Sequence, residues 1–218
     1  MKYQRGNALV YILIGVALFA ALSYTFSRNA STGSTSLTDE QTTLYAHQLI
    51  NHAQQMEQVV QQMLMTGSAI DDIDFTKPGE AGYGTNAQHQ VYHPSGGGMN
   101  LFNESNLNLF GPNSYTWDGW TYNTQTNVEW TSTGVDDIIF TFLNISGPVC
   151  AKVNEILIGD DTVPVETLPP RNTFSEPEGG NSDLTATNCA SCEGRYHFCA
   201  QDNQVAGVRA FYNIIASE

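Results

Sequence analysis

The residues best suited to chemistry in this chain are its four cysteines, Cys150, Cys189, Cys192 and Cys199. Four thiolates, two of them in a CxxC pair, can hold a tetrahedral zinc ion in a reducing compartment. In an oxidising compartment, an even number of cysteines instead predicts two disulfide bonds. A redox-active CxxC pair normally opens a helix after a strand, whereas Cys189 follows a stretch rich in proline and glycine. We favour two structural disulfides, and the residues alone leave three pairings open.

Acidic and histidine clusters give weaker signals for a metal. Asp160 and Asp161 are the first candidates for a calcium site, because calcium prefers carboxylate oxygens. No acidic run matches the EF-hand loop, so we predict no cofactor and keep calcium as the alternative. His89-x-x-x-His93 has the spacing of two ligands on one helical turn, but Pro94 and three glycines follow it and disfavour a helix. We interpret these histidines as surface residues.

Trp117, Trp120 and Trp130 lie close together in a stretch rich in Gly, Asn, Ser and Thr. Flat rings stack on sugar faces, so these residues are candidates for a glycan-binding platform, although such residues more often form the core of a small sheet. The chain has no GxSxG motif, no Gly-rich phosphate loop and no catalytic cysteine–histidine signature. We therefore predict that the protein is not an enzyme.

The charge of the chain excludes one class of partner. It contains 22 acidic and 8 basic residues, which gives a formal net charge of −14. Such a surface repels the phosphate backbone, so we predict no nucleic-acid partner.

An apolar run lies near the start of the chain. Lys2 and Arg5 precede the run, which extends uncharged to Phe26 and would span about 28 Å as a helix. We predict a basic leader at 1–6, a transmembrane helix at 7–26, a flexible linker at 27–36 and an exported domain at 37–218. A cleaved secretory signal, with its site near Ala21-Leu22-Ser23, is the alternative. The basic leader places the N-terminus in the cytoplasm and the domain in the periplasm or outside the cell, as a single-pass inner-membrane protein.

The leader also carries a resemblance. Arg5-Gly6, followed by Asn7-Ala8-Leu9-Val10-Tyr11 and an apolar run, resembles the leader of type IV pilins and type II secretion pseudopilins. The resemblance implies cleavage between Gly6 and Asn7 by a prepilin peptidase, and packing with other pilin-like subunits. Tyr11 departs from the family, which usually has glutamate there.

Most of the remaining chain resembles a group of alphaproteobacterial prepilin-like proteins of unknown role. The shared segments are 17–28, a Gln-rich helix, 94–98, 137–145, Val149-Cys150 and 211–215. In this group, a cysteine that opens a short helix has a partner near the last strands. The resemblance therefore implies the pairing Cys150–Cys192, which leaves Cys189–Cys199 as the second bond.

Three elements are predicted from periodicity and capping. Thr38 and Gln41 form a capping box that opens a helix, and Gly67 ends it. The apolar residues of this helix recur at steps of three and four and lie on one face. The apolar run 138–143 predicts a central strand, and Pro148 opens a short helix after it. Segments 195–199 and 205–215 are predicted as closing strands.

Together these elements predict an α+β fold. A transmembrane helix precedes a long amphipathic helix, which packs on a small antiparallel sheet with long loops, as in a pilin head. The predicted function is that of a structural pilin-like or pseudopilin-like subunit anchored in the inner membrane, acting in filament or secretion-apparatus assembly. The alternative is a membrane-tethered module that binds a glycan or an envelope protein through its Trp/Tyr loops.

Overall fold

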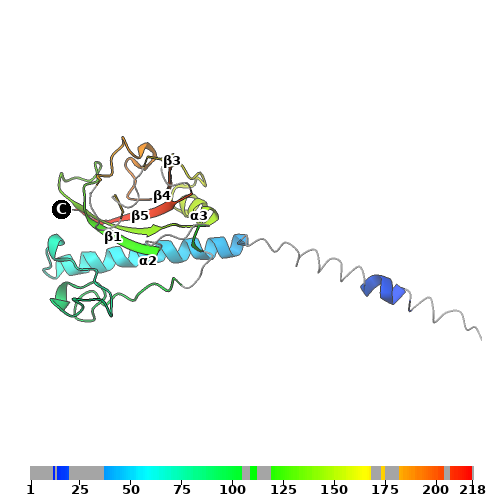
Figure 1. The fold of residues 1–218 in the computed structure, drawn as a ribbon, viewed down its shortest axis with the longest axis horizontal. Helices are drawn as coiled ribbons and strands as arrows, with labels where there is room; N and C mark the ends of the chain where they lie inside the picture. Colours follow the sequence, from blue (N-terminus) through cyan, green and yellow to red (C-terminus); the bar gives the residue numbers. More distant parts are fainter. Residues whose placement is uncertain are drawn as a thin grey trace, which may run out of the picture. The chain divides into compact units, whose positions relative to one another are not determined.

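The computed structural model describes residues 12, 14–19, 37–104, 109–111, 119–167, 173–174, 182–203 and 207–217 (Figure 1). The chain divides into two units, Met1–Ser36 and Leu37–Glu218, and each is considered by itself.

In the first unit, the described residues 14–19 are helical. Within the described part of the chain, no helix has both the length and the apolarity to cross a membrane. This finding contradicts the transmembrane helix predicted at 7–26 and the single-pass inner-membrane location drawn from it. The predicted leader at 1–6, with Gly6 and Asn7, and the predicted linker at 27–36 lie outside the described residues.

The second unit is built on one five-stranded sheet with the order β1-β2-β5-β4-β3. The strands are β1 Gly119–Thr126, β2 Asp137–Leu143, β3 Val165–Glu166, β4 His197–Asp202 and β5 Arg209–Ala216. The pairs β1–β2, β2–β5 and β4–β5 are antiparallel, but the short β3 runs parallel to β4. The sheet is therefore mixed. The predicted fold class is wrong in its antiparallel sheet as well as in its transmembrane helix.

Strand β2 is buried along its whole length, as its continuous apolarity predicted. Ile138, Phe140 and Phe142 point to one face of the sheet, and Ile139 and Leu143 point to the other. This alternation follows from the period of two residues in a strand. The sheet thus has a separate apolar cluster on each face.

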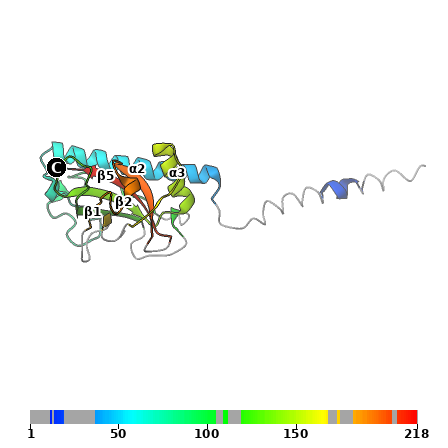
Figure 2. The ribbon, with the colours of Figure 1, turned by 90° about the horizontal axis from the view of Figure 1, so that it is seen from above.

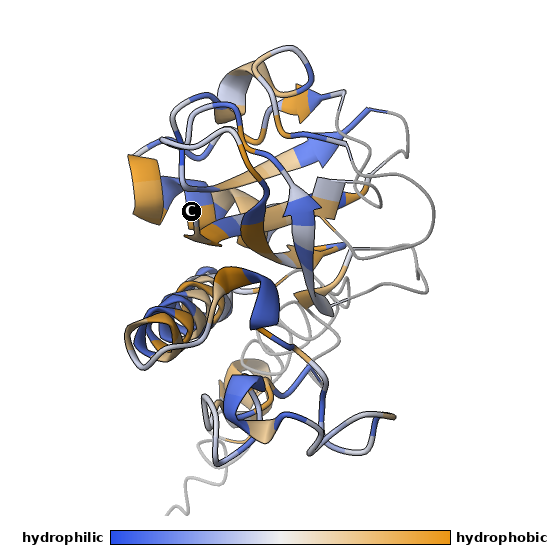
Figure 3. Cartoon of the chain, turned by 90° about the vertical axis from the view of Figure 1, so that its left-hand side faces the viewer, coloured by the Kyte–Doolittle hydropathy of each residue, from blue (hydrophilic) through white to orange (hydrophobic). Residues whose placement is uncertain are grey.

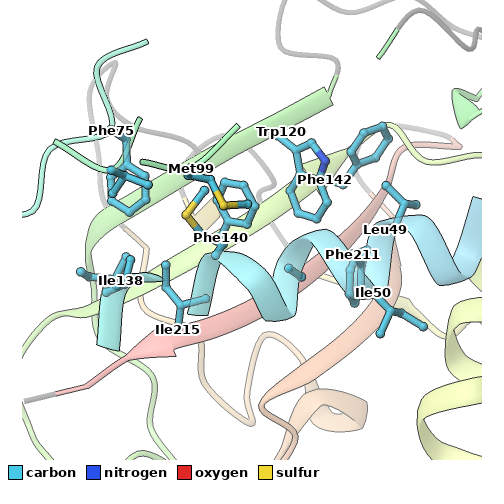
Figure 4. Close-up of a cluster of buried hydrophobic side chains, with 14 of the residues drawn as sticks. Leu49, Ile50, Phe75, Met99, Trp120, Ile138, Phe140, Phe142, Phe211 and Ile215 are labelled. Carbon is cyan, nitrogen blue, oxygen red and sulfur yellow. The ribbon is translucent and has the colours of Figure 1, made fainter. Parts of the chain in front are cut away.

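Helix α2, Asp39–Met65, covers the first face (Figure 4). The predicted capping box is confirmed: Thr38 Oγ1 accepts from the backbone N–H of Gln41, and Gln41 Oε1 accepts from the backbone N–H of Thr38. Leu49 and Met56 are fully buried among the aromatic side chains of β1, β2 and β5. The segment that follows α2, with the short 3-10 helices η1 Ile70–Asp72 and η2 Ala87–His89, also contributes to this cluster.

Helix α3, Gly147–Ile158, lies beside the N-terminal half of α2 (Figure 2). Pro148 occupies its first turn, and Gly159 ends it with a positive φ of 76°. That conformation suits a residue without a Cβ atom, which explains the glycine.

Loops cover the second face of the sheet. Leu184 and Phe174 pack there against Ile139 and Tyr212. The 3-10 helix η4, Ala190–Cys192, belongs to this layer.

Candidate functional site

The four cysteines form two disulfide bonds, but not the predicted pairs. Cys150 is bonded to Cys199, with a Cα–Cα distance of 5.6 Å, and Cys189 is bonded to Cys192, with a Cα–Cα distance of 5.2 Å. The pairing implied by the resemblance, Cys150–Cys192 with Cys189–Cys199, is wrong.

The two faces of the sheet explain the observed pairing. In β4, Phe198 and Ala200 point to the loop-covered face, so Cys199 between them points to the face that carries the helices. Cys150 in α3 lies on that same face. Cys189 and Cys192 lie in the cluster on the opposite face. Either predicted bond would have to cross the sheet.

The tryptophans do not form a shared platform. Trp120 is 6% exposed and stacks on Phe140, with ring centroids 4.4 Å apart and planes inclined by 5°. Trp130 packs on the opposite face of the sheet, where its Nε1–H donates to the carbonyl of Arg195. Trp117 lies outside the described residues. Because the ring of Trp120 is covered by protein, it is not free to stack on a sugar.

A hollow of about 160 Å³ opens beside Trp120. Its lining is His52, Lys77, Tyr92, Leu101, Phe102, Glu104 and Trp120. Burial lowers the pKa of His52 to about 4, so its imidazole is neutral at pH 7. Burial, and then the charge of Glu104, raises the pKa of Tyr92.

In this hollow, Glu104 binds the backbone at the start of β1. Its Oε1 accepts a hydrogen bond of 2.9 Å from the backbone N–H of Trp120. The carboxylate lies so close to Gly119 that a Cβ atom there would be 2.3 Å from Oε2, and Gly119 has a φ of +100°. The start of β1 therefore requires a glycine. The hollow was not anticipated from the sequence, because its lining comes from segments far apart in the chain.

Asp160 and Asp161 are exposed, and within the described part of the chain neither belongs to a group that could hold a metal ion. Oδ1 of Asp160 accepts from the backbone N–H of Thr162 at 2.9 Å, and the hydrogen bonds from Thr162 lower the pKa of this carboxyl. Among the described residues, no group of three His, Cys, Asp or Glu side chains is placed to hold a metal ion. His89 is bound through Nδ1 to Ser68 Oγ at 2.9 Å.

The outer side of α2 carries a regular line of exposed residues. Seven exposed residues recur there at alternating steps of four and three, and we call them the amide stripe: Leu44, Gln48, Asn51, Gln55, Gln58, Gln62 and Met65. This spacing keeps all seven on one face of the helix. At 1.5 Å per residue, the stripe is about 32 Å long.

The amide stripe contains no charged residue, although the chain has a net charge of −14. Glu57 is the one Asp, Glu, Lys or Arg residue between Gln41 and Met65, and it lies beside the stripe, half-buried. A groove of about 570 Å³ follows the C-terminal half of the stripe, lined by Gln54, Glu57, Gln58, Gln61, Gln62 and Met65. The glutamines are evident in the sequence. Only the structure shows which residues of α2 are buried, and therefore which ones form the exposed stripe.

Comparisons with protein families, with characterised proteins and with solved structures give no match to this chain.

Proposed function

We propose that this protein is a non-catalytic, pilin-like or pseudopilin-like structural subunit that acts in the assembly of a filament or a secretion apparatus. The observation that carries the proposal is the amide stripe, an uncharged line about 32 Å long on the outside of a rigid helix.

Charge favours this surface as the assembly contact. Outside the stripe, the chain carries 22 acidic and 8 basic residues. Those parts of the chain therefore repel another acidic subunit that approaches closely. Glutamine and asparagine side chains each donate and accept hydrogen bonds, so a stripe of amides can bind another protein without burying a charge.

The core supports the stripe as a rigid element. Leu49, Met56 and Val60 on the inner side of α2 are fully buried. On the flank, Gln61 Nε2 donates to the carbonyl of Ile215 at 3.0 Å, which ties α2 to β5. A helix held in this way loses little conformational freedom when it binds a partner.

The leader resemblance is part of the same proposal. A prepilin peptidase would cut between Gly6 and Asn7, and the partners would be copies of this chain or other pilin-like subunits. The buried Trp120 gives no support to the alternative of a glycan-binding module.

A photo-crosslinking amino acid at position 55 tests the proposal in the native cells. We expect adducts with this chain or with another pilin-like subunit. The matched control is position 132, because Ser132 is exposed in the loop between β1 and β2. No specific adduct at position 55, or equal adducts at both positions, would refute the assembly role of the stripe.

A further inference from the structure

We propose that the hollow beside Trp120 binds a small zwitterion, an amino acid with an apolar side chain, whose carboxylate pairs with Lys77 and whose ammonium group pairs with Glu104. The lining of this hollow shares no residue with the amide stripe. The proposal therefore goes beyond the assembly role and does not depend on it.

Three parts of the fold line the hollow. Viewed along α2, the sheet lies on one side of the helix and the segment with η1 and η2 lies on another (Figure 3). His52 comes from α2, Trp120 comes from β1, and the other lining residues come from positions 77–104. The volume of about 160 Å³ is below the ~300 Å³ at which pockets for drug-sized ligands begin, so the hollow suits a molecule as small as an amino acid.

Two opposite charges line the hollow without pairing with each other. Lys77 is the one Lys or Arg residue between Leu37 and Glu104. Its backbone N–H donates to Glu80 Oε2 at 2.7 Å, but within the described part of the chain its ammonium group forms no salt bridge. Among the same residues, Glu104 forms none either, and the backbone N–H of Trp120 holds its carboxylate in place. Both charges are therefore available to a ligand that pairs with each of them.

This pair of charges selects a zwitterion. An anion would pair with Lys77 but be repelled by Glu104, and for a cation the two effects are reversed. A molecule with one carboxylate and one ammonium group pairs with both, and no net charge enters the hollow. Leu101, which is 49% exposed, and the half-buried Phe102 offer apolar surface to the side chain of the ligand.

His52 gives the hollow a buried polar group without a partner. This residue is 7% exposed, and among the described residues neither of its ring nitrogens has a hydrogen-bond partner. Unlike Nε1 of Trp120, these nitrogens are not fully enclosed, so they belong to the part of the ring that lines the hollow. The rings of Phe102 and Trp120 pack against the imidazole and fix its orientation. It can therefore donate to a carboxylate, or accept from an ammonium group, with little loss of freedom.

Calorimetric titration of the full chain with leucine tests the site. We expect saturable binding of one leucine per chain. N-Acetyl-leucine lacks the ammonium group and leucinamide lacks the carboxylate, so each should bind at least about tenfold more weakly. No saturable binding of leucine, or equal affinity for leucine and either analogue, would overturn the proposal.

Variants without one of the charges identify the two partners. In Lys77→Met, the preference for leucine over leucinamide should disappear, because the group that pairs with the carboxylate is gone. In Glu104→Gln, which keeps an acceptor for the N–H of Trp120, the preference for leucine over N-acetyl-leucine should disappear instead. Lys152→Met removes a positive charge outside the hollow and should bind leucine as the wild type does.

A ratio of two affinities separates loss of the site from loss of the fold. Partial unfolding lowers the affinity for both ligands equally and leaves their ratio unchanged. Unchanged preferences in both variants would show that leucine binds elsewhere, and would overturn the assignment of the hollow.

His52→Phe keeps an aromatic ring and removes the two nitrogens. Leucine should bind severalfold more weakly to this variant at pH 7.5, because one hydrogen bond to the ligand is lost. Affinity equal to that of the wild type would contradict the contact between His52 and the ligand.

Discussion

The side-chain amide of Asn154 binds both backbone groups of Cys199. Oδ1 of Asn154 accepts from the Cys199 N–H at 2.9 Å, and Nδ2 donates to its carbonyl at 2.8 Å. Nδ2 also donates to the carbonyl of Thr162 at 2.9 Å. Strand β3 pairs with β4 at Gln201 and Asp202 only. Asn154 therefore takes the place of a neighbouring strand where β3 does not reach.

Loss of this amide should destabilise the domain strongly. In Asn154→Ala, the buried N–H and carbonyl of Cys199 lose their partner, and we expect the free energy of unfolding to fall by about 2–4 kcal/mol. Urea denaturation measures the change. Glu155→Ala, at an exposed neighbour on α3, is the control. A loss in Asn154→Ala no larger than in the control would show that the amide contributes little.

The two disulfides should contribute unequally. Cys150–Cys199 joins residues 49 apart, whereas Cys189–Cys192 joins residues 3 apart. By the chain-entropy relation, replacing the first pair with serine should cost about 4 kcal/mol and the second about 2 kcal/mol. Urea denaturation gives the two values, and non-reducing peptide mapping gives the pairing. A peptide that joins Cys150 to Cys192 would contradict the structure.

His52 should make stability dependent on pH. Its pKa falls from 6.5 to about 4 on folding, because burial disfavours the charged ring. Above pH 6.5 the ring is neutral in both states. Between pH 6.5 and 4 the unfolded chain binds a proton that the folded chain does not, so stability falls as the pH falls. The loss should reach roughly 2 kcal/mol at pH 5.

Replacing the imidazole isolates this effect. His52→Phe keeps a ring beside Phe102 and Trp120, whose centroids lie 4.9 and 5.1 Å from that of His52. We expect urea denaturation of this variant at pH 7.5 and 5 to show a smaller difference than in the wild type. Other titrating groups, such as Asp74 and Asp137, are present in both proteins and cancel. His47→Gln, at an exposed position on α2, should behave as the wild type does.

Gly97 should tolerate no side chain. A Cβ atom there would lie 2.5 Å from Val59 Cγ1 and 2.5 Å from the carbonyl oxygen of Val91. Gly97→Ala should therefore push this turn away from α2 and lower the melting temperature, at a cost of about 1–3 kcal/mol. Gly134→Ala is the control, because nothing lies within 4 Å of its Cβ position. Equal melting temperatures for the two variants would contradict the close packing of this turn.

The proposed processing predicts a defined N-terminus. Protein isolated from its native cells should begin at Asn7, as intact mass and N-terminal sequencing would show. A start at Met1 would remove the prepilin peptidase from the proposal and leave the amide stripe as its only support.

Two local signals predicted the structure correctly, whereas the apolar run at 7–26 and the signals that depend on sheet geometry did not. The capping box at Thr38 and the buried strand 138–143 involve residues close in the chain, so capping and apolarity were sufficient. The cysteine pairing depends on which face of β4 carries Cys199, and the resemblance did not include that information. In the same way, Trp120 and Trp130 are close in sequence but lie on opposite faces of the sheet.

Strand β5 occurs late in the sequence, yet it lies in the middle of the sheet, between β2 and β4. Until residues 209–216 have been synthesised, β1–β2 and β3–β4 have no strand to join them. Contacts between residues so far apart in the chain slow folding. During this time the edge of β2, which is apolar along most of its length, is open to pairing with other chains. We therefore expect the nascent chain to depend on a chaperone that shields β2 until β5 arrives.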